Sequence, residues 1–290
     1  MQSDNWKLLV FSIKNFRQNT LNRALIGHTV ENISEPIQRE DILAYATATS
    51  DHNPAYESAH PIVPPFFLTS LFLPVLKKIW FDNALKLNIF RMVHAQQDIH
   101  WHHPIHCGDQ LRIIGTIRDI IDTPAGELLE ISVEAFRTDK LVAEGKTGLI
   151  VRKKRDRAKL KSPDNTASPV TMRIKIKTEK DQPRQYAAAS GDYNLIHTSK
   201  LAAKLAGLPA PIMHGTCVMA MSCAALVEAR LNNDNTRLSG ISGRFARPTI
   251  PGENLTLVGY ETPERNCLPF EVLNMRDEKV IKNGMLKFHS

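Results

Sequence analysis

The chain has 290 residues, of which 42% are hydrophobic and 23% charged, with a formal net charge of +7. These values are typical of a soluble globular protein with one large domain or two ordinary ones. They exclude a membrane-spanning chain, because no apolar run reaches the ~18 residues that cross a bilayer. The N-terminus lacks the basic and apolar regions of a signal peptide, so we expect a cytoplasmic protein with no membrane partner.

The first half begins with a short helical stretch over residues 38–48, which leads into a turn rich in Asp and Asn. An apolar helix is expected over residues 66–80, where Pro74 lacks an amide N–H and should kink or interrupt it. Alternating, β-branched strands are predicted over residues 111–117, 128–137 and 141–151.

Five histidines lie close together between the helix and the first of these strands: His94, His100, His102, His103 and His106. His100 and His102 would share one strand face, which is a spacing that suits metal ligands. The aligned segment of the second half contains no histidine, and no carboxylate obviously completes a ligand set. We therefore expect no metal site here.

Residues 152–169 combine a basic run with a stretch rich in Pro, Ser and Asn, and seven of the ten side chains from Arg152 to Lys161 are cationic. No aromatic residues are interleaved with these charges. We therefore favour an exposed linker over a nucleic-acid-binding segment. It would divide the chain into two units, residues 1–151 and 170–290.

The second half repeats the order of the first. A short helix is expected over residues 182–189, followed by a turn and by a helix over residues 216–230. This second helix is apolar over most of its circumference, which predicts that other elements surround it. Strands are predicted over residues 255–260, 268–274 and 279–288.

Two sequence matches, in the same order, indicate a tandem duplication. Residues 45–56 match residues 186–197, with Tyr, Ala, Asp and Asn identical in place, and residues 101–111 match residues 245–255. Each unit then contains one buried helix followed by antiparallel strands, which is an α+β arrangement.

No two cysteines form a CxxC motif, and this predicts a reduced compartment and no disulfide. The cysteines are Cys107, Cys217, Cys223 and Cys267.

The turn of the second half contains the residues with catalytic potential. Asp192 and His197 stand five residues apart, with Gly191 before them and Asn194 between them. A carboxylate and an imidazole brought together by a short turn can share one water molecule. Gly215 opens the apolar helix, where free backbone N–H groups stabilise negative charge on an acyl oxygen. These groups suit the addition of water to a polarised acyl group, or its removal.

The segment Tyr186…Ser190-Gly-Asp-x-Asn-x-Ile-His197, followed by Ile212-x-His214-Gly215, resembles the signature of the MaoC-like dehydratases, also called hydratase 2. Leu195 departs from the proline that the family usually has at this place. The resemblance implies the hot-dog fold, an antiparallel sheet wrapped around a long helix, and the duplication implies a double hot-dog member. Such a chain is a monomer that mimics a hot-dog dimer, with further homodimerisation left open.

The resemblance also implies roles by position. Asp192 and His197 would be the catalytic acid/base pair, Asn194 would brace the turn and orient the water, and the N–H of Gly215 would bind the thioester oxygen. Further substrate-binding positions would be Tyr186, Ser190, Gly191, His214, Arg244 and Arg247, with the two arginines placed for nucleotide phosphates.

The implied reaction is the reversible hydration of a trans-2-enoyl thioester to the (3R)-hydroxyacyl thioester in fatty acid metabolism. It uses no metal and no redox cofactor.

The first unit departs from this pattern. Asp51 keeps a carboxylate, but Tyr56 stands at the imidazole position and Ser50 at the glycine position, and Phe67 or Leu68 falls near the position of the His-Gly pair. We expect that this unit has lost the chemistry, kept the fold, and accommodates the acyl chain.

Several alternatives remain open at this point. The carrier could be acyl carrier protein instead of coenzyme A, and the chain could be a non-catalytic acyl-thioester-binding partner subunit. Asp192 and His197 could be a turn-capping residue and a satisfied histidine, although the whole set of residues argues against this. A serine nucleophile at Ser190 is discounted, because no GxSxG motif surrounds it.

Overall fold

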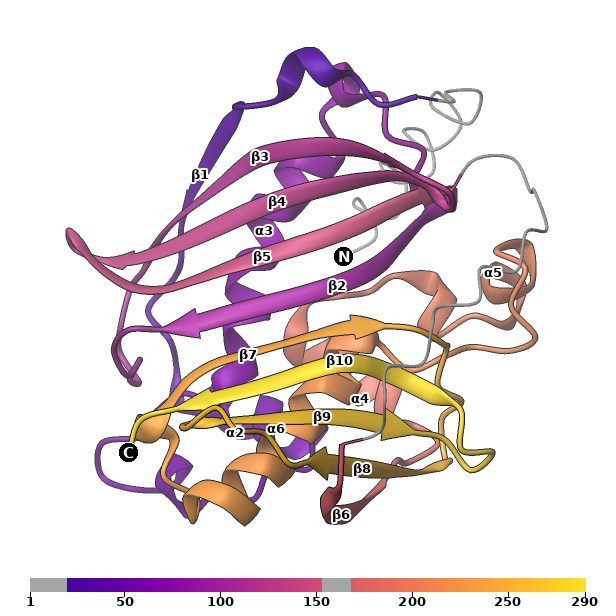
Figure 1. Ribbon diagram of the computed structural model, residues 1–290. Helices are drawn as coiled ribbons and strands as arrows, with labels where there is room; N and C mark the ends of the chain where they lie inside the picture. Colours follow the sequence, from indigo (N-terminus) through magenta and orange to yellow (C-terminus); the bar gives the residue numbers. More distant parts are fainter. Residues whose placement is uncertain (1–19, 153–167) are drawn as a thin grey trace.

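The computed structural model describes residues 20–152 and 168–290. The predicted linker, residues 152–169, therefore lies almost wholly outside the described residues. In the described part of the chain all ten strands join in one antiparallel sheet, with the order β1-β3-β4-β5-β2-β7-β10-β9-β8-β6. Figure 1 shows the sheet in front and the helices behind it.

Each unit contributes five neighbouring strands to this sheet. The first unit supplies β1 (Thr29–Ile33), β2 (Met92–Trp101), β3 (Arg112–Thr123), β4 (Gly126–Arg137) and β5 (Lys140–Arg152). The second supplies β6 (Val170–Lys177), β7 (Leu238–Phe245), β8 (Asn254–Tyr260), β9 (Cys267–Leu273) and β10 (Lys279–Phe288).

The strand order within the first unit, β1-β3-β4-β5-β2, repeats in the second as β6-β8-β9-β10-β7. The duplication read from the sequence is therefore a duplication of topology. The two units meet where β2 pairs antiparallel with β7, with Ile99 opposite Ile241. Joining the units in this way pairs the inner edge strand of each, so neither β2 nor β7 has an exposed edge there.

Two longer helices pack behind the sheet, one for each unit: α3 (Leu68–Trp80) and α6 (Gly215–Leu231). The shorter helices are α2 (Arg39–Ala48), α4 (Gln182–Ser190) and α5 (Lys200–Leu205). Every residue from 217 to 223 in α6 is buried, which confirms that this helix is surrounded. Two units that each wrap a sheet around one helix make the α+β, double hot-dog fold.

The prediction that Pro74 interrupts its helix is wrong, because α3 runs continuously from Leu68 to Trp80. Pro74 lies on the exposed side of α3, while side chains on both sides of it, including Leu73 and Val75, are buried. Their packing against the sheet offsets the one hydrogen bond that proline removes.

The six strands predicted from alternation are all present, and four others were missed. β1 and β6 are edge strands whose residues are mostly exposed, so they show little apolar alternation. β7 contains Gly240 and Gly243. A Cβ on Gly243 would lie 2.4 Å from Cε of Met219, so a side chain there would have to displace the end of this α6 methionine.

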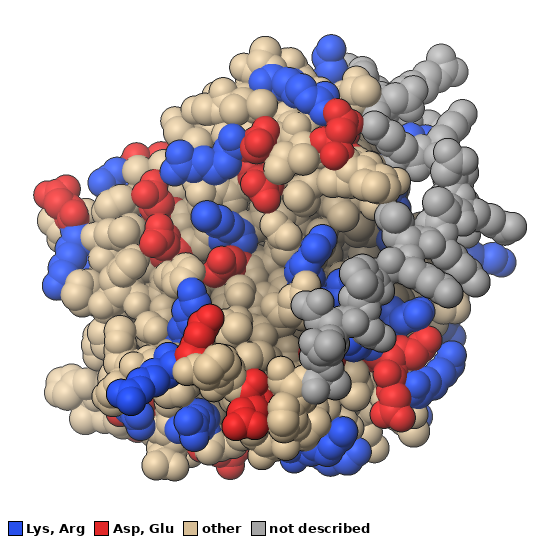
Figure 2. Space-filling view, in the orientation of Figure 1, with Lys and Arg blue, Asp and Glu red and all other residues tan. Residues whose placement is uncertain are grey.

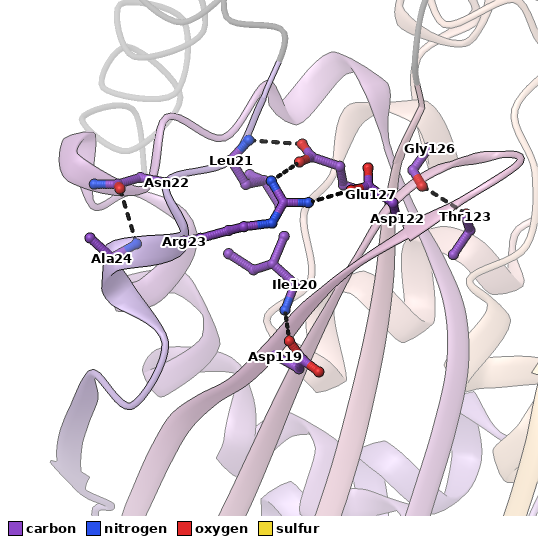
Figure 3. A network of polar contacts seen from close by, with 10 residues as sticks. All are labelled: Leu21, Asn22, Arg23, Ala24, Asp119, Ile120, Asp122, Thr123, Gly126 and Glu127. Atoms are coloured by element: carbon purple, nitrogen blue, oxygen red, sulfur yellow. Dashed lines mark hydrogen bonds and ion pairs between the residues drawn. The ribbon is translucent and has the colours of Figure 1, made fainter.

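A buried carboxylate holds the start of the described chain against the first unit. Glu127, at 2% exposure, accepts hydrogen bonds from the backbone N–H of Leu21 (2.8 Å) and from Arg23 Nη1 (2.8 Å). Arg23 also pairs with Asp122 at 2.9 Å, as Figure 3 shows. This network has a clear structural role, because it satisfies a charge that would be costly to bury alone.

On the face seen in Figure 2, the cationic and anionic side chains of the described residues are interspersed. That distribution does not resemble a nucleic-acid-binding stripe. All four cysteines are free, as predicted. Within residues 20–152 and 168–290, no helix has the length and hydropathy needed to span a bilayer.

Candidate active site

The turn after helix α4 is built by short-range hydrogen bonds. Ser190 Oγ donates to the carbonyl of Tyr186 (2.7 Å) and accepts from the N–H of Asp192 (3.2 Å). Gly191 ends the helix with φ of +73°, in the left-handed region. Ser190 and Gly191 thus turn the chain sharply toward the pocket, and the hydroxyl of Ser190 is fully used in doing so.

Asn194 shapes the rest of the turn. The carboxylate oxygen Oδ1 of Asp192 accepts from the N–H of Asn194 (3.2 Å), and Oδ1 of Asn194 accepts from the N–H of Ile196 (3.3 Å). This cap starts the short 3₁₀ turn η6 (Leu195–His197), which carries His197 back toward Asp192. The side chain of Asn194 is exposed and its oxygen is engaged, so it braces the turn; a role in orienting water stays a prediction.

His197 is held in one tautomer. Its Nδ1 lies 2.9 Å from the carbonyl oxygen of Ile212, which can only accept, so Nδ1 carries the proton. The lone pair of the neutral ring is then on Nε2. The side chain is buried, and burial lowers the pKa of His197 from its usual 6.5 despite the opposing effect of the Asp192 carboxylate. A neutral imidazole with a free Nε2 is the form that a general base needs.

His214 supports this histidine from the other side. Its ring stacks on that of His197, with centroids 3.6 Å apart and planes at 27°. Its Nε2 donates to the backbone carbonyl of Asp192 (3.0 Å), and its ring also contacts Tyr186. Burial, together with the neighbouring His197, lowers the pKa of His214 to about 3, so both rings are neutral. His214 therefore links the start of α6 to the turn formed by residues 191–197, called the catalytic turn below.

Asp192, His197 and His214 each place one potential ligand atom within 4.8 Å of the others. A metal would need the two ring nitrogens to point at one centre at ~2.1 Å. Two nearly parallel rings stacked at 3.6 Å direct their in-plane lone pairs past each other instead. The arrangement therefore suits proton transfer better than metal binding. The histidines from His94 to His106 form no such group within the described residues.

Gly215 is the first residue of α6. The first hydrogen bond of the helix runs from Val218 N–H to the carbonyl of His214 (3.1 Å), so the amides of residues 215–217 lie outside the helical ladder. A Cβ on Gly215 would lie 2.9 Å from Cδ1 of Phe245. Glycine therefore lets the Phe245 ring approach the helix start, where backbone N–H groups at the positive end of a helix can bind an anion.

The predicted phosphate-binding arginines lie outside the catalytic turn. Arg244 is exposed on β7, opposite Gln96 of β2, and Arg247 follows that strand. Arg247 is exposed and pairs with Glu278 at 3.5 Å. The segment after it is joined to the loop that carries His214, since the N–H of Met213 donates to the carbonyl of Thr249 (2.9 Å).

The equivalent turn of the first unit has the same bracing but a closed centre. Asp51 Oδ1 accepts from the N–H of Asn53 (3.3 Å), and Asn53 Oδ1 accepts from the N–H of Ala55 (3.0 Å). Tyr56 then donates its phenolic proton to Asp51 Oδ2 (2.7 Å) and accepts from Asn235 Nδ2 (2.9 Å). Burial raises the pKa of both Asp51 and Tyr56. The Tyr56 hydroxyl therefore occupies one oxygen of the Asp51 carboxylate, and this turn offers no imidazole to act with it.

The pocket beside the catalytic turn is lined by both units. Asp192, Ser190 and Tyr186 face residues of α3 across it, and Thr216 of α6 closes one side. Two residues of the first unit were missed by sequence reasoning. Lys77 donates from Nζ to the carbonyl of Gly191 (3.0 Å), and His94 lines the pocket close enough for the charge of Asp192 to affect its pKa.

Of these two residues, only His94 stood out in the sequence. It belongs to the histidine cluster, which was considered as a metal site and not as part of the acyl pocket. Lys77 carries no motif, and only the packing of one unit on the other reveals its contact.

Two family descriptions match the two units in turn. A FAS1-like dehydratase domain region matches residues 24–144, and a MaoC like domain matches residues 161–267. The 3-hydroxyacyl-thioester dehydratase Y of Mycobacterium tuberculosis is 30% identical over 207 residues, which cover 66% of this chain and 71% of that protein. The chain belongs to the MaoC-like dehydratase family and is a hydro-lyase.

Other similarities agree with the fold. The peroxisomal multifunctional enzyme type 2 of mouse is 27% identical over 179 residues, but the match spans only 24% of that longer protein. A MaoC-like dehydratase of Phytophthora capsici superposes with a TM-score of 0.76 at 20% identity, covering 93% of this chain and 98% of the other. A Mycobacterium tuberculosis protein described as a double hot-dog superposes with a TM-score of 0.62 at 11% identity, covering 91% and 96%.

Proposed function

We propose that this hydro-lyase catalyses the reversible addition of water to trans-2-enoyl thioesters, giving (3R)-hydroxyacyl thioesters. The observation that carries the proposal is the neutral His197, whose Nδ1–H donates to the carbonyl of Ile212 and whose ring lies within 4.8 Å of the Asp192 carboxylate. Relatives named 3-hydroxyacyl-thioester dehydratase and enoyl-CoA hydratase 2 support the same substrate class.

In the hydration direction, Nε2 of His197 takes a proton from the attacking water while the water oxygen adds to C3. The imidazolium that forms is stabilised by the Asp192 carboxylate, which opposes the effect of burial on the pKa of His197. The same proton then passes to C2, so the atoms of one water molecule are all accounted for. Asp192 would orient the water as well as stabilise the cation.

The negative charge that develops on the thioester oxygen during this step needs a donor. We assign that role to the N–H of Gly215, at the start of α6 and outside its hydrogen-bond ladder. Preorganised backbone donors of this kind typically contribute ~3–4 kcal/mol to the stabilisation of a transition state. Tyr186, Ser190, Gly191 and His214 would act by holding the turn and the pocket wall.

The division of labour between the units is part of the proposal. Residues 170–290 form the catalytic unit, and residues 1–151 form a degenerate unit that supplies the pocket wall opposite the catalytic turn. Coenzyme A is the proposed carrier, with Arg244 and Arg247 near its phosphates, and acyl carrier protein is the alternative. A role in fatty acid metabolism and a cytoplasmic location are further predictions; the mouse relative is named as peroxisomal.

A non-catalytic partner subunit is the second candidate from the sequence. It is disfavoured because the pair at Asp192 and His197 is held ready for chemistry, whereas the pair at Asp51 and Tyr56 is bonded to itself.

The test is a steady-state hydration assay with crotonyl-CoA and longer enoyl-CoAs, with the chirality of the product determined. Formation of the (3R)-hydroxyacyl product supports the proposal. No turnover of any enoyl thioester on either carrier would contradict it.

A further inference from the structure

The pocket beside the catalytic turn has a polar lining that the proposed hydration step does not use. One face of α3 forms the wall opposite the turn, through Thr69, Ser70, Phe72, Leu73, Leu76 and Trp80. With a rise of ~1.5 Å per residue, the wall extends for about 15 Å along the helix. The cavity volume is about 40 Å³.

Three lining residues of this pocket hold a buried polar atom that has no hydrogen-bond partner among the described residues. They are Ser70 Oγ, Trp80 Nε1 and His94 Nε2. Other polar atoms of the same lining are satisfied, for example Thr147 Oγ1, which donates to Gln97 Oε1 (3.0 Å). Because nearly all buried polar groups in proteins find a partner, three exceptions in one pocket point to a ligand that supplies it.

The unpaired state of Ser70 follows from its neighbours. A helical serine commonly donates to the carbonyl four residues earlier, which here belongs to Phe66. That oxygen already accepts from Tyr45 Oη (2.8 Å) and from Thr69 Oγ1 (2.8 Å), so both of its lone pairs are in use. Ser70 is left with its hydroxyl unpaired, in the wall of the pocket.

The other two atoms lie at different places in the pocket. Trp80 is the last residue of α3, ten positions after Ser70, and its N–H can only donate. His94 lies near the reacting end, since its ring contacts Phe245 at 4.8 Å and Phe245 covers Gly215. Unpaired polar atoms are therefore available both beside the reacting carbons and farther along the chain.

We propose that this pocket selects enoyl thioesters whose acyl chain carries a neutral oxygen, either a hydroxyl or a carbonyl group. The inference rests on the proposed hydratase function and names its substrate class. A plain hydrocarbon chain would displace water and leave the three groups unpaired, which disfavours binding. A site built to hydrogen-bond an oxygen rejects an analogue that lacks it far more strongly than an apolar pocket rejects one extra methylene.

An anionic chain end fits less well. The Asp192 carboxylate lines the same pocket, its lining contains no lysine or arginine among the described residues, and Lys77 Nζ is bonded to the carbonyl of Gly191. A buried carboxylate would therefore meet a like charge without a free partner.

The test compares three CoA thioesters of equal chain length: a plain trans-2-hexenoyl chain, the same chain with a terminal hydroxyl, and the same chain with a ketone. The purified enzyme should show kcat/KM higher by about 10-fold or more for at least one oxygenated chain. Ser70→Ala or Trp80→Phe should lower that preference at least several-fold, because each removes a donor and keeps the fold of α3.

Two matched controls separate this effect from general damage. Ser222→Ala removes a buried serine hydroxyl on α6 that is satisfied by Val218, and Trp101→Phe alters a tryptophan in the wall of a different pocket. Both should leave the ratio between the substrates within about twofold, because neither side chain lines this pocket.

The outcomes distinguish the two proposals. Turnover of the plain chain with no preference for oxygen, or a preference that survives both Ser70→Ala and Trp80→Phe, would overturn the pocket inference and leave the hydratase assignment standing. If none of the three is hydrated while crotonyl-CoA is, the pocket inference fails alone; if no enoyl thioester on either carrier is hydrated, the hydratase assignment itself fails.

Discussion

The two Asp-Asn turns of this protein have the same backbone bracing and opposite chemical states. In each, the aspartate carboxylate accepts from the N–H of the asparagine, and the asparagine oxygen caps a short 3₁₀ turn, η2 (Pro54–Tyr56) or η6 (Leu195–His197). The residue at the end of the 3₁₀ turn determines whether the aspartate is bonded to its own turn. Tyr56 donates to its aspartate and closes the pair, whereas His197 turns its proton to Ile212 and leaves a lone pair free.

The heads of the two central helices show the same relation. Phe67 precedes α3 and contacts Tyr45, just as His214 precedes α6 and contacts Tyr186. The aromatic packing is retained in both units, while the ring nitrogens are found in only one. One unit can therefore lose its chemistry with little change in fold, because ring packing and turn capping do not require the imidazoles.

The residue before each aspartate adopts the same backbone conformation in both units. Gly191 has φ of +73°, and Ser50, at the same place in the first unit, has φ of +52°. The backbone therefore adopts the left-handed conformation in both units, and glycine eases it without being essential.

The largest effect is expected from removing the base. His197→Ala should lower kcat for enoyl thioester hydration by about 10²- to 10⁴-fold, the usual contribution of a general acid–base group. The matched change Tyr56→Ala should leave kcat nearly intact while lowering the melting temperature. Near-normal turnover by His197→Ala, at unchanged substrate affinity, would show that the base lies elsewhere.

The closed pair of the first unit should matter for stability. Tyr56→Phe keeps the ring but leaves the buried Asp51 carboxylate without its hydroxyl donor, at a cost of about 1–3 kcal/mol. Urea unfolding would measure this loss, and kcat should stay within about twofold of the parent. A large drop in kcat with no change in stability would mean that this pair takes part in the reaction.

Acid should destabilise the protein through two buried histidines, His94 and His214. Burial lowers the pKa of His94 to about 4 and that of His214 to about 3, below the usual 6.5. The unfolded state then binds protons more readily, so the stabilisation is complete above pH 6.5 and is lost as the pH falls toward 4. Urea unfolding across this range should show the decline, and His214→Phe, which adopts the first-unit residue type, should make it shallower.

The smallest effect concerns the carrier. Arg247 is exposed and shared with Glu278, so Arg247→Ala should raise KM for enoyl-CoA only about two- to fivefold, with kcat unchanged. An N-acetylcysteamine thioester, which lacks the nucleotide, should be unaffected. Glu278→Gln would free the arginine and should not raise KM. An equal rise for the truncated thioester would make Arg247 a structural residue.

The sequence predicted the repeat, the two central helices and the strands with strong apolar alternation. It also predicted that Asp192 and His197 lie together in one turn, because their spacing falls within one short segment; their catalytic role stays a prediction. The sequence did not predict the features that depend on packing against another part of the fold. Helix α3 continues through Pro74 because its neighbours are buried, and the glycines of β7 lie in a strand where α6 packs on Gly243 and β2 packs on Gly240.

The pocket wall could not be predicted from local patterns for the same reason. Lys77 and His94 are far from Gly191 in the chain, and only the packing of the two units, which includes the pairing of β2 with β7, brings them close to it. The hydrogen-bond partner of the His197 ring also depends on tertiary structure, because Ile212 lies in the loop before α6.

The most direct measurement places Asp192→Asn and Asp51→Asn side by side in one single-turnover hydration assay, with thermal melts of both. Two aspartates in equivalent turns then differ only in their partners. Asp192→Asn should lose about 10²- to 10⁴-fold in the rate of hydration while melting near the parent, and Asp51→Asn should keep the parent rate. Equal losses of rate in both variants would contradict the assignment of the chemistry to the second unit alone.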